Sequence, residues 1–392
     1  MIRFRNTNKH NFSLLCILLF FTTAAYTQDS LRVKTKDSVR TSALKIGGAL
    51  RLNYNLSSWK PQQVKRGGDF GFDLFRINVK AKHKDVSLNA EYRLYSAAFG
   101  GGMLKQGWFG YNFKNNKTIL QIGLTQVPFG NQTYNSNNWF FNLPYYLGFE
   151  DDHDMGLKLI HKTEHFKYHF AFFKNAEELK FGNTSTISPN RYSYDISGRN
   201  KEVNQANVKV DYLFGENKRS VVSVFGEYGG LYNVVTKAFG DHYAYGLSLN
   251  SKWNKLNLKA QIFSFEFRAN DTIPNNGIIE MAAYGAPYNV AEAGKMFTFG
   301  IAYDVDLNWG PITNVTIYND FAFFDKSKSS FTDSYMNVFG AMFTAGNVYT
   351  YVDFAMGKNH SWLGPNWTNS FSTGDPSEAW NLRFNINFGY YF

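Results

Sequence analysis

The chain ends, over residues 380–392, in the stretch Trp-Asn-Leu-Arg-Phe-Asn-Ile-Asn-Phe-Gly-Tyr-Tyr-Phe. Apolar and aromatic side chains occupy every even position from Trp380 to Phe392, whereas amides, an arginine, a glycine and a tyrosine occupy the odd positions. Successive side chains of a strand point to opposite faces, so this segment has one apolar face and one mostly polar face. A strand that lies between lipid and a water-filled lumen requires that pattern.

The same segment resembles the carboxy-terminal sorting strand of bacterial outer-membrane proteins, which typically ends in Phe after alternating aromatics. Phe388, Tyr390 and Phe392 carry the resemblance, which implies that they act as an assembly signal. The partners it implies are the barrel assembly machinery, followed by outer-membrane lipid and lipopolysaccharide around the finished barrel.

The composition agrees with a strand-rich membrane protein. Aromatic residues make up 18% of the 392 residues, with 38 Phe and 25 Tyr, although the mean hydropathy is −0.35. A soluble chain of this length would usually divide into several domains, and a large barrel is the usual exception. No stretch after residue 30 is long and apolar enough for a membrane helix.

The amino terminus predicts a secretory signal peptide over residues 1–27. Three basic residues precede an apolar run at 14–21, which is too short to span a bilayer, and small residues follow at 22–25. Residues 28–42 then form a short polar lead in the periplasm, and 43–392 form the barrel. The only cysteine, Cys16, lies in the signal, so disulfides and cysteine-ligated metal are excluded from the mature chain.

Alternating segments recur along the chain, and the connections between them alternate in length. Short connections are expected near 83–85, 114–117, 162–164, 215–218, 251–254, 305–311 and 345–347. Longer ones are expected near 57–69, 96–103, 128–154, 175–204, 229–240, 269–294, 324–335 and 357–379. The predicted fold is all-β: a transmembrane antiparallel β-barrel of about 16 strands, with short periplasmic turns, long outer loops and both termini periplasmic. The alternation blurs at 219–228, 259–268 and 336–344.

The polar positions of the strands predict which charges face the lumen. The net charge of the chain is +10. The predicted inward basic residues are Lys45, Arg51, Arg76, Lys80, Arg93, Lys167, Lys209, Lys259 and Arg383. Fewer acids are expected to face inward: Glu91, Asp211, Asp304, Asp320 and Asp353. Such a basic excess favours anions, while pairing across the lumen explains most of these residues individually. The basic residues form no stripe, so no nucleic-acid partner is expected.

The loop at 128–154 is unusual because it is rich in aromatic residues and ends in acids. We expect it to fold into the lumen against the barrel wall, with a subunit interface or the outer mouth as alternatives. The residues assigned to this constriction loop are Pro128, Gly130, Tyr134, Trp139, Tyr145, Asp151, Asp152 and Asp154. Its acids suit a divalent cation, a solvated rim or partners for lumen arginines.

Short motifs resemble the phosphate-selective porin family of the O and P type. They are the stretch Val127-Pro128-Phe129-Gly130, the aromatic loop after it, the restart at Asp154-Met155-Gly156, the stretch Phe75-Arg76-Ile77 and the terminal Phe. The resemblance covers residue 43 onwards and implies a sixteen-stranded, usually trimeric, anion-conducting barrel. Family members that select phosphate have a dense basic ladder near the constriction. This loop has no Arg or Lys between Gly130 and Asp154, which argues against phosphate selectivity but not against the fold.

We therefore predict an outer-membrane porin that passes small hydrophilic solutes, prefers anions because of its inward basic excess, and forms a homotrimer. No enzyme activity, cofactor or metal is predicted. His161-Lys-Thr-Glu-His165 matches a zinc-protease string, but it falls at a turn where a helix would be needed. Two alternatives remain: a channel specific for phosphate or oligosaccharides, and a non-channel barrel acting in secretion or surface assembly.

Overall fold

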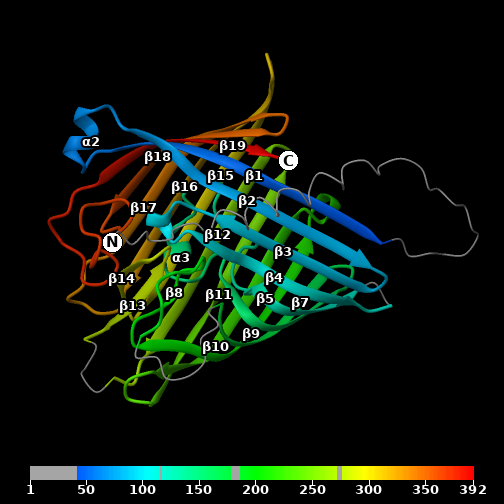
Figure 1. The fold of residues 1–392 in the computed structure, drawn as a ribbon, viewed down its shortest axis with the longest axis horizontal. Helices are drawn as coiled ribbons and strands as arrows, with labels where there is room; N and C mark the ends of the chain where they lie inside the picture. The colour runs from blue at the N-terminus through cyan, green and yellow to red at the C-terminus, as the bar shows by residue number, and fades with distance from the viewer. Residues whose placement is uncertain (1–41, 115–116, 178–185, 272–275) are drawn as a thin grey trace, which may run out of the picture. The chain divides into compact units, whose positions relative to one another are not determined.

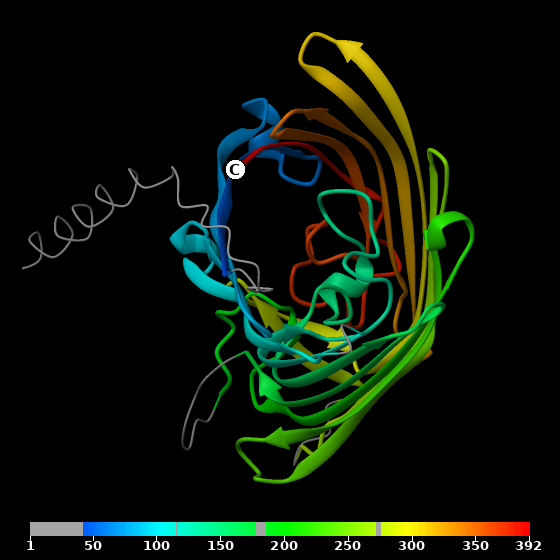
Figure 2. The same ribbon diagram turned by 90° about the vertical axis from the view of Figure 1, so that its right-hand side faces the viewer.

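The computed structural model describes residues 42–114, 117–177, 186–271 and 276–392. The expected signal peptide and the lead up to residue 41 lie outside the described residues. The unit Ser42–Phe392 contains a closed barrel of sixteen antiparallel strands and a separate three-stranded sheet. Figures 1 and 2 show the ring of strands. The predicted all-β barrel and its strand number are confirmed.

The strands and short helices have the following bounds. The barrel strands are β1 (Ala43–Ser57), β2 (Asp69–His83), β3 (Val86–Leu94), β4 (Gly102–Asn112), β5 (Thr118–Gln126), β6 (His153–Lys162), β7 (Phe166–Ala176), β9 (Asn200–Phe214), β10 (Ser220–Asn233), β11 (Phe239–Trp253), β12 (Leu256–Arg268), β15 (Ala293–Trp309), β16 (Ile312–Lys326), β17 (Ser334–Ala345), β18 (Val348–Lys358) and β19 (Asn381–Tyr391). The separate sheet has the order β14 (Ala286–Ala291), β13 (Ile278–Ala283), β8 (Asp195–Ile196). The helices are α2 (Pro61–Lys65), η1 (Ala97–Phe99), α3 (Leu143–Tyr146) and η2 (Glu216–Lys218). Among the described residues, no helix has the length and apolar character to cross a membrane.

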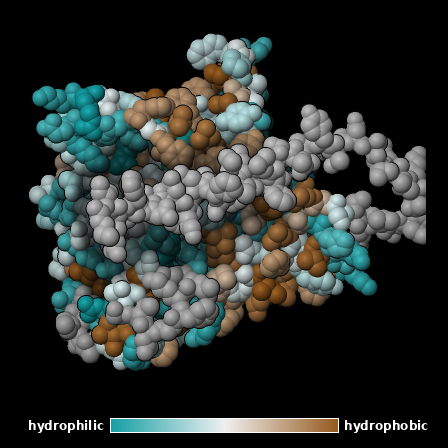
Figure 3. All heavy atoms as spheres, in the orientation of Figure 1, coloured by the Kyte–Doolittle hydropathy of each residue, from teal (hydrophilic) through white to brown (hydrophobic). Residues whose placement is uncertain are grey.

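Strand β19 shows the alternation that the sequence predicts. Asn385 and Asn387 are buried on the inner face, whereas Phe388 and Tyr390 are 39% and 52% exposed on the outer face. Large apolar side chains are exposed in the same way on the other barrel strands, and Figure 3 shows them gathered over the strands. An apolar outer face of this kind is the surface that a transmembrane barrel presents to lipid.

The barrel closes where β19 pairs with β1. Leu50 lies opposite Tyr390 in the register, and the backbones of Gly48 and Phe392 exchange hydrogen bonds of 2.9 and 3.1 Å. A Cβ atom at Gly48 would lie 2.6 Å from Cζ of the Phe392 ring. The last aromatic residue therefore needs a glycine on the first strand to complete the seam.

Short and long connections alternate around the barrel as predicted, except that one connection expected to be long is short. The expected long loop at 229–240 is wrong, because β10 continues to Asn233 and β11 begins at Phe239. The glycines at 229, 230 and 240 lie within these strands. A side chain at Gly240 would collide with the carbonyl oxygen of Arg268 on β12, so close strand packing accounts for that glycine.

Part of the inner face is apolar, which explains why the alternation blurs in β12 and β17. Phe263, Phe265 and Phe267 point inward from β12 and are at most 3% exposed, while Ile262 faces outward. Met336 and Val338 of β17 are likewise buried. These side chains belong to one hydrophobic core with the loop after β5 and with β13 and β14. This part of the barrel interior therefore packs against loops and not against water.

Candidate pore constriction

The third long loop, residues 127–152 between β5 and β6, is called L3 here. Gly130 has a φ of +55°, and a side chain at this position would collide with the amide of Gln261 on β12. The next residue, Asn131, donates its backbone N–H to Gln261 Oε1 at 2.9 Å. Glycine is therefore required at this turn, because it permits both the left-handed backbone and the close approach.

L3 crosses the lumen to the opposite wall. Strand β16 lies eight places from β5 in the ring of sixteen. Its Asp320 accepts hydrogen bonds from the backbone and side-chain nitrogens of Asn137 and Asn138, at 2.7 to 3.1 Å. Lys259 of β12 also donates to the Ser136 carbonyl at 2.7 Å. Figure 2 shows L3, in teal, inside the ring of strands. The inward-folding prediction therefore fits the observed contacts.

The aromatic residues of L3 pack against both the barrel wall and other loops. The ring centroid of Phe129 lies 4.4 Å from that of Phe225 on β10, and that of Phe149 lies 4.9 Å from that of Phe263 on β12. Tyr145 stacks on Phe141 with a centroid distance of 4.0 Å, and its hydroxyl lies 2.8 Å from that of Tyr284, between β13 and β14. Tyr145 is 6% exposed and lies against the turn between β13 and β14, so its ring does not face the lumen. Trp139 is half-buried and Tyr134 is 38% exposed.

Five basic side chains lie on the inner faces of five adjacent strands and form what we call the basic wall. They are Arg383 of β19, Arg51 of β1, Arg76 of β2, Arg93 of β3 and Lys105 of β4. Four of them were predicted from the sequence. The prediction missed Lys105, although its alternation with the outward-facing Leu104 is a usable signal.

Four of the five residues of the basic wall form ion pairs, but only three acidic side chains take part in these pairs. Arg51 pairs with Asp73 at 2.8 Å, and Lys105 pairs with Asp151 of L3 at 2.6 Å. Arg76 and Arg93 face each other in the register and share Glu91, at 3.5 and 2.6 Å. One carboxylate between two guanidinium groups leaves a positive charge at this place.

L3 approaches the basic wall through its aromatic residues as well. The guanidinium of Arg51 lies 5.9 Å from the Trp139 ring centroid, and Lys105 Nζ lies 5.5 Å from that of Tyr134. Arg383 lies 5.2 Å from the ring of Trp59 and donates to Ser57 Oγ at 3.3 Å. The narrow part of the lumen is therefore framed by L3 on one side and by the basic wall on the other.

The other predicted basic residues lie in separate groups. Lys167 and Lys209 line a cavity of about 320 Å³ together with Lys162, and Lys209 pairs with Asp211 at 3.1 Å. Lys45 and Lys80 are exposed and lie opposite each other in the register near the short-turn end of β1 and β2. The nine predicted residues therefore do not form one continuous ladder.

The acids of L3 are not a solvated rim. Asp151 is 4% exposed and pairs with Lys105, as expected for a partner of a lumen cation. Asp154 is 1% exposed and Asp152 is half-buried. Both lie beside further carboxylates from β8, β9 and β10.

The zinc-protease string at 161–165 spans the end of β6 and the turn before β7, so it has no helix to place both histidines together.

Comparison with solved structures shows the same fold in outer-membrane porins and channels. The anion-selective porin from Comamonas acidovorans matches with 11% identity and a TM-score of 0.57, over 90% of this chain and 100% of that chain. The outer membrane channel DcaP of Acinetobacter baumannii matches with 11% identity and a TM-score of 0.56, over 92% and 99%. OmpT of Vibrio cholerae, in its trimer form, matches with 12% identity and a TM-score of 0.56, over 90% and 99%.

No protein-family model matches the chain, and a search of curated proteins finds no match either. At these identities the structural likeness shows the fold alone. The class that it defines is the sixteen-stranded barrel of outer-membrane porins.

Proposed function

We propose that this chain is an outer-membrane porin, a passive channel for small hydrophilic solutes with a preference for anions. The observation that carries the proposal is the position of L3. The loop is fastened to β16 at Asp320, and its other side faces the basic wall. Solutes would pass along the exposed part of the basic wall, at Arg51 and Arg76, whose side chains keep 17% and 21% of their surface exposed, without a catalytic cycle or a cofactor.

The charge of the basic wall supports the anion preference. Arg76 and Arg93 share one carboxylate, and the side chain of Arg76 keeps 21% of its surface exposed. Charges that line a tube with low-dielectric walls act over a longer range than charges on an open surface. An excess of fixed cations at the constriction therefore raises the local concentration of anions.

The location and assembly belong to the same proposal. Residues 1–27 would direct export, residues 28–42 would form the periplasmic lead, and both termini would lie in the periplasm. Phe388, Tyr390 and Phe392 would serve the barrel assembly machinery. A homotrimer is supported by the trimer form of OmpT, whose fold the chain shares, and chemical cross-linking in native membranes would test it.

A selectivity measurement tests the proposal. The wild-type channel in a planar bilayer, under a potassium chloride gradient, should give a reversal potential on the anion side. The double variant Arg76→Gln/Arg383→Gln should move it toward cations, because it removes two fixed charges at the constriction. Lys80→Gln is the matched control: its side chain is exposed near the short-turn end, where salt screens it strongly.

The same recordings separate the alternatives. Absence of current from correctly folded protein would favour the non-channel barrel, and a preference for potassium would overturn the anion reading. Block of the chloride current by phosphate would favour the phosphate-selective assignment. A sugar channel would depend on stacking at Tyr134, which is 38% exposed, and at the half-buried Trp139, because Phe140, Tyr145 and Tyr146 are at most 6% exposed.

A further inference from the structure

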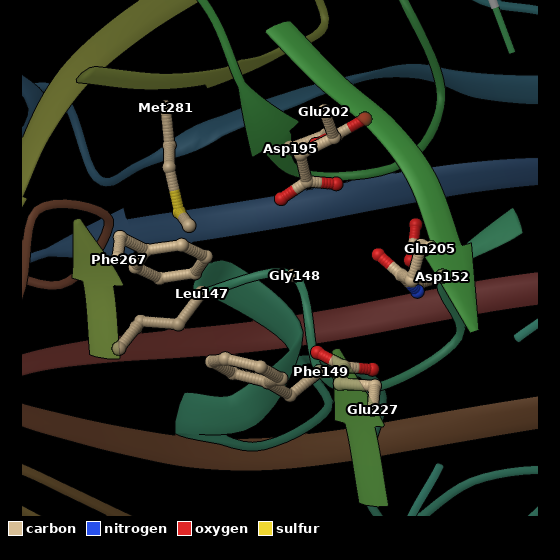
Figure 4. A pocket seen from close by; sticks show the side chains of 10 residues that line it. All are labelled: Leu147, Gly148, Phe149, Asp152, Asp195, Glu202, Gln205, Glu227, Phe267 and Met281. Atoms are coloured by element: carbon tan, nitrogen blue, oxygen red, sulfur yellow. The ribbon is translucent and has the colours of Figure 1, made fainter. Parts of the chain in front are cut away.

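Six carboxylates from separate segments converge inside the barrel, beside the end of L3, and are called the carboxylate cluster. They are Asp152 at the end of L3, Asp154 of β6, Glu177 after β7, Asp195 of β8, Glu202 of β9 and Glu227 of β10. Figure 4 shows four of them, Asp152, Asp195, Glu202 and Glu227, around a common space. Neither the basic wall nor the proposed passage of solutes uses this cluster.

The distances in the cluster suit a bound ion. One carboxylate oxygen each from Asp154, Glu177 and Asp195 lies within 4.8 Å of the other two. Two oxygens on opposite sides of a Ca²⁺ ion, each at about 2.4 Å, are also about 4.8 Å apart. An adjoining cavity of about 10 Å³ is lined by Asp152, Asp195, Glu202 and Glu227, which is room for a single ion or water molecule.

Two oxygens of the cluster have no hydrogen-bond donor among the residues that the structure describes. They are Oδ1 of Asp154, a residue that is 1% exposed, and Oε2 of Glu177. The other Glu177 oxygen accepts the Ser193 N–H at 3.1 Å. A buried carboxylate oxygen without a donor is costly, and a cation in contact with it would supply the missing partner.

The charges of the cluster also require compensation. Arg191 pairs with Asp195 at 2.7 Å, which offsets one of the six negative charges. The remaining carboxylates lie close together, and a metal cation among them would offset their charge.

A cation would contact Oδ1 of Asp154, for which the described residues supply no donor. Hard cations with flexible coordination, Ca²⁺ above all, take several carboxylate oxygens at once. Mg²⁺ demands near-ideal octahedral geometry and keeps more of its waters, which suits a cluster of this many carboxylates less well.

We propose that the carboxylate cluster is a Ca²⁺ site, with Asp154, Glu177 and Asp195 as the primary ligands. Asp152, Glu202 and Glu227 surround it and complete the oxygen-rich environment. The ion joins the start of β6, directly after L3, to the segment after β7 and to β8, so it holds the end of L3 in its inward position. The site is independent of the selectivity of the channel and of whether the barrel conducts.

Calcium binding to the full-length protein, folded in detergent and stripped with EDTA, tests the proposal. Calorimetric titration with calcium chloride at pH 8 should show one ion bound per chain. Calcium should also raise the temperature at which the folded band unfolds in heat-modifiability electrophoresis. The variant Asp154→Asn/Glu177→Gln should bind at least tenfold more weakly. Asp304→Asn is the matched control, because Asp304 pairs with Lys252 on the inner face far along the chain from the cluster.

Three results would overturn the site. They are no binding by the wild type at millimolar calcium, equal binding by the double variant and the wild type, and binding of magnesium in preference to calcium. If the double variant does not fold, terbium luminescence of the wild type replaces it. Terbium should be sensitised by Tyr192 and Tyr194, which lie within three residues before Asp195 in the sequence, and calcium should displace it. Absence of that emission would also contradict the proposal.

Discussion

At the scale of single residues, Glu150 shows how the loop depends on a buried acid. Its carboxylate is 4% exposed, and it accepts the Asn135 N–H at 2.8 Å. Burial is the main cause that raises its pKa from 4.5 to about 8, with Asp151 and Asp320 adding to it and Lys259 opposing. Glu150 is therefore mostly protonated in the folded protein at neutral pH.

This shift predicts that L3 loses stability as the pH rises. A raised pKa means that the folded state binds a proton that the unfolded state has released. The stabilisation is complete below pH 4.5 and is lost as the pH rises through about 8. The loss amounts to roughly 4–5 kcal/mol. The unfolding temperature in heat-modifiability electrophoresis should fall between pH 5 and pH 8, and Glu150→Gln should reduce that fall. An unchanged fall in the variant would contradict the assignment.

At the scale of elements, L3 is predicted to set the conductance. Excision of residues 136–147 removes α3 and the contacts with Asp320, so single-channel conductance should increase several-fold. Unchanged conductance with loss of trimers would instead place the loop at a subunit interface. Current that arises only after excision would mean that the native barrel is plugged, and the porin proposal would then fail.

A point variant tests whether the position of L3 sets the conductance, because it leaves the loop itself intact. Asp320→Ala removes the acceptor of four hydrogen bonds from Asn137 and Asn138 and keeps the loop at full length. Hydrogen bonds to a charged group contribute about 1.5–3 kcal/mol each, so the loop should detach in part. The open-channel current should be larger and noisier than in the wild type, while Asp304→Asn should leave it unchanged.

The closing strand β19 carries a second prediction at this scale. Deleting Phe392 removes the residue whose backbone pairs with Gly48 of β1, as well as the last aromatic of the expected assembly signal. The amount of heat-modifiable barrel in the outer membrane should decrease severalfold. Gly48→Val should act in the same direction, because its side chain would meet the Phe392 ring. Normal outer-membrane levels of the deletion would argue against both roles of the strand.

At the scale of the whole barrel, the interior is divided between a charged part and an apolar part. The basic wall covers β19 and β1 to β4, whereas the apolar core lines β10 to β12 and β15 to β18 and carries the packed loops. A positive field in the lumen would therefore come from one side of the barrel. Its reach is limited by the salt within the channel.

This asymmetry predicts a selectivity that depends on ionic strength. The screening length falls from about 10 Å at 0.1 M salt to about 3 Å at 1 M, so the basic wall acts on fewer ions at high salt. The anion-to-cation permeability ratio from reversal potentials should fall toward one over that range. A ratio that is constant with salt would mean that ions are selected by direct contact and not by the field of the wall.

Much of the fold follows from alternation along the chain. The strand number, the seam strand with its inward Asn385 and outward Phe388, and the alternating connections were all predicted. Lys105 could have been found by the same argument. These features are local, because a strand between water and lipid must alternate polar and apolar side chains at successive residues. The prediction failed at 229–240 because the sequence alone does not distinguish a glycine that permits close strand packing from a glycine that forms a turn.

The constriction and the carboxylate cluster depend on contacts that no local pattern records. Asp320 binds Asn137 across more than 180 positions of sequence, and Asp154 meets Glu177 and Asp195 only because separate strands and a loop converge. Alternation establishes the face on which a side chain lies, but not its partner across the lumen. Closure of the barrel decides that partner, since only a closed ring of sixteen strands places β5 and β16 opposite each other.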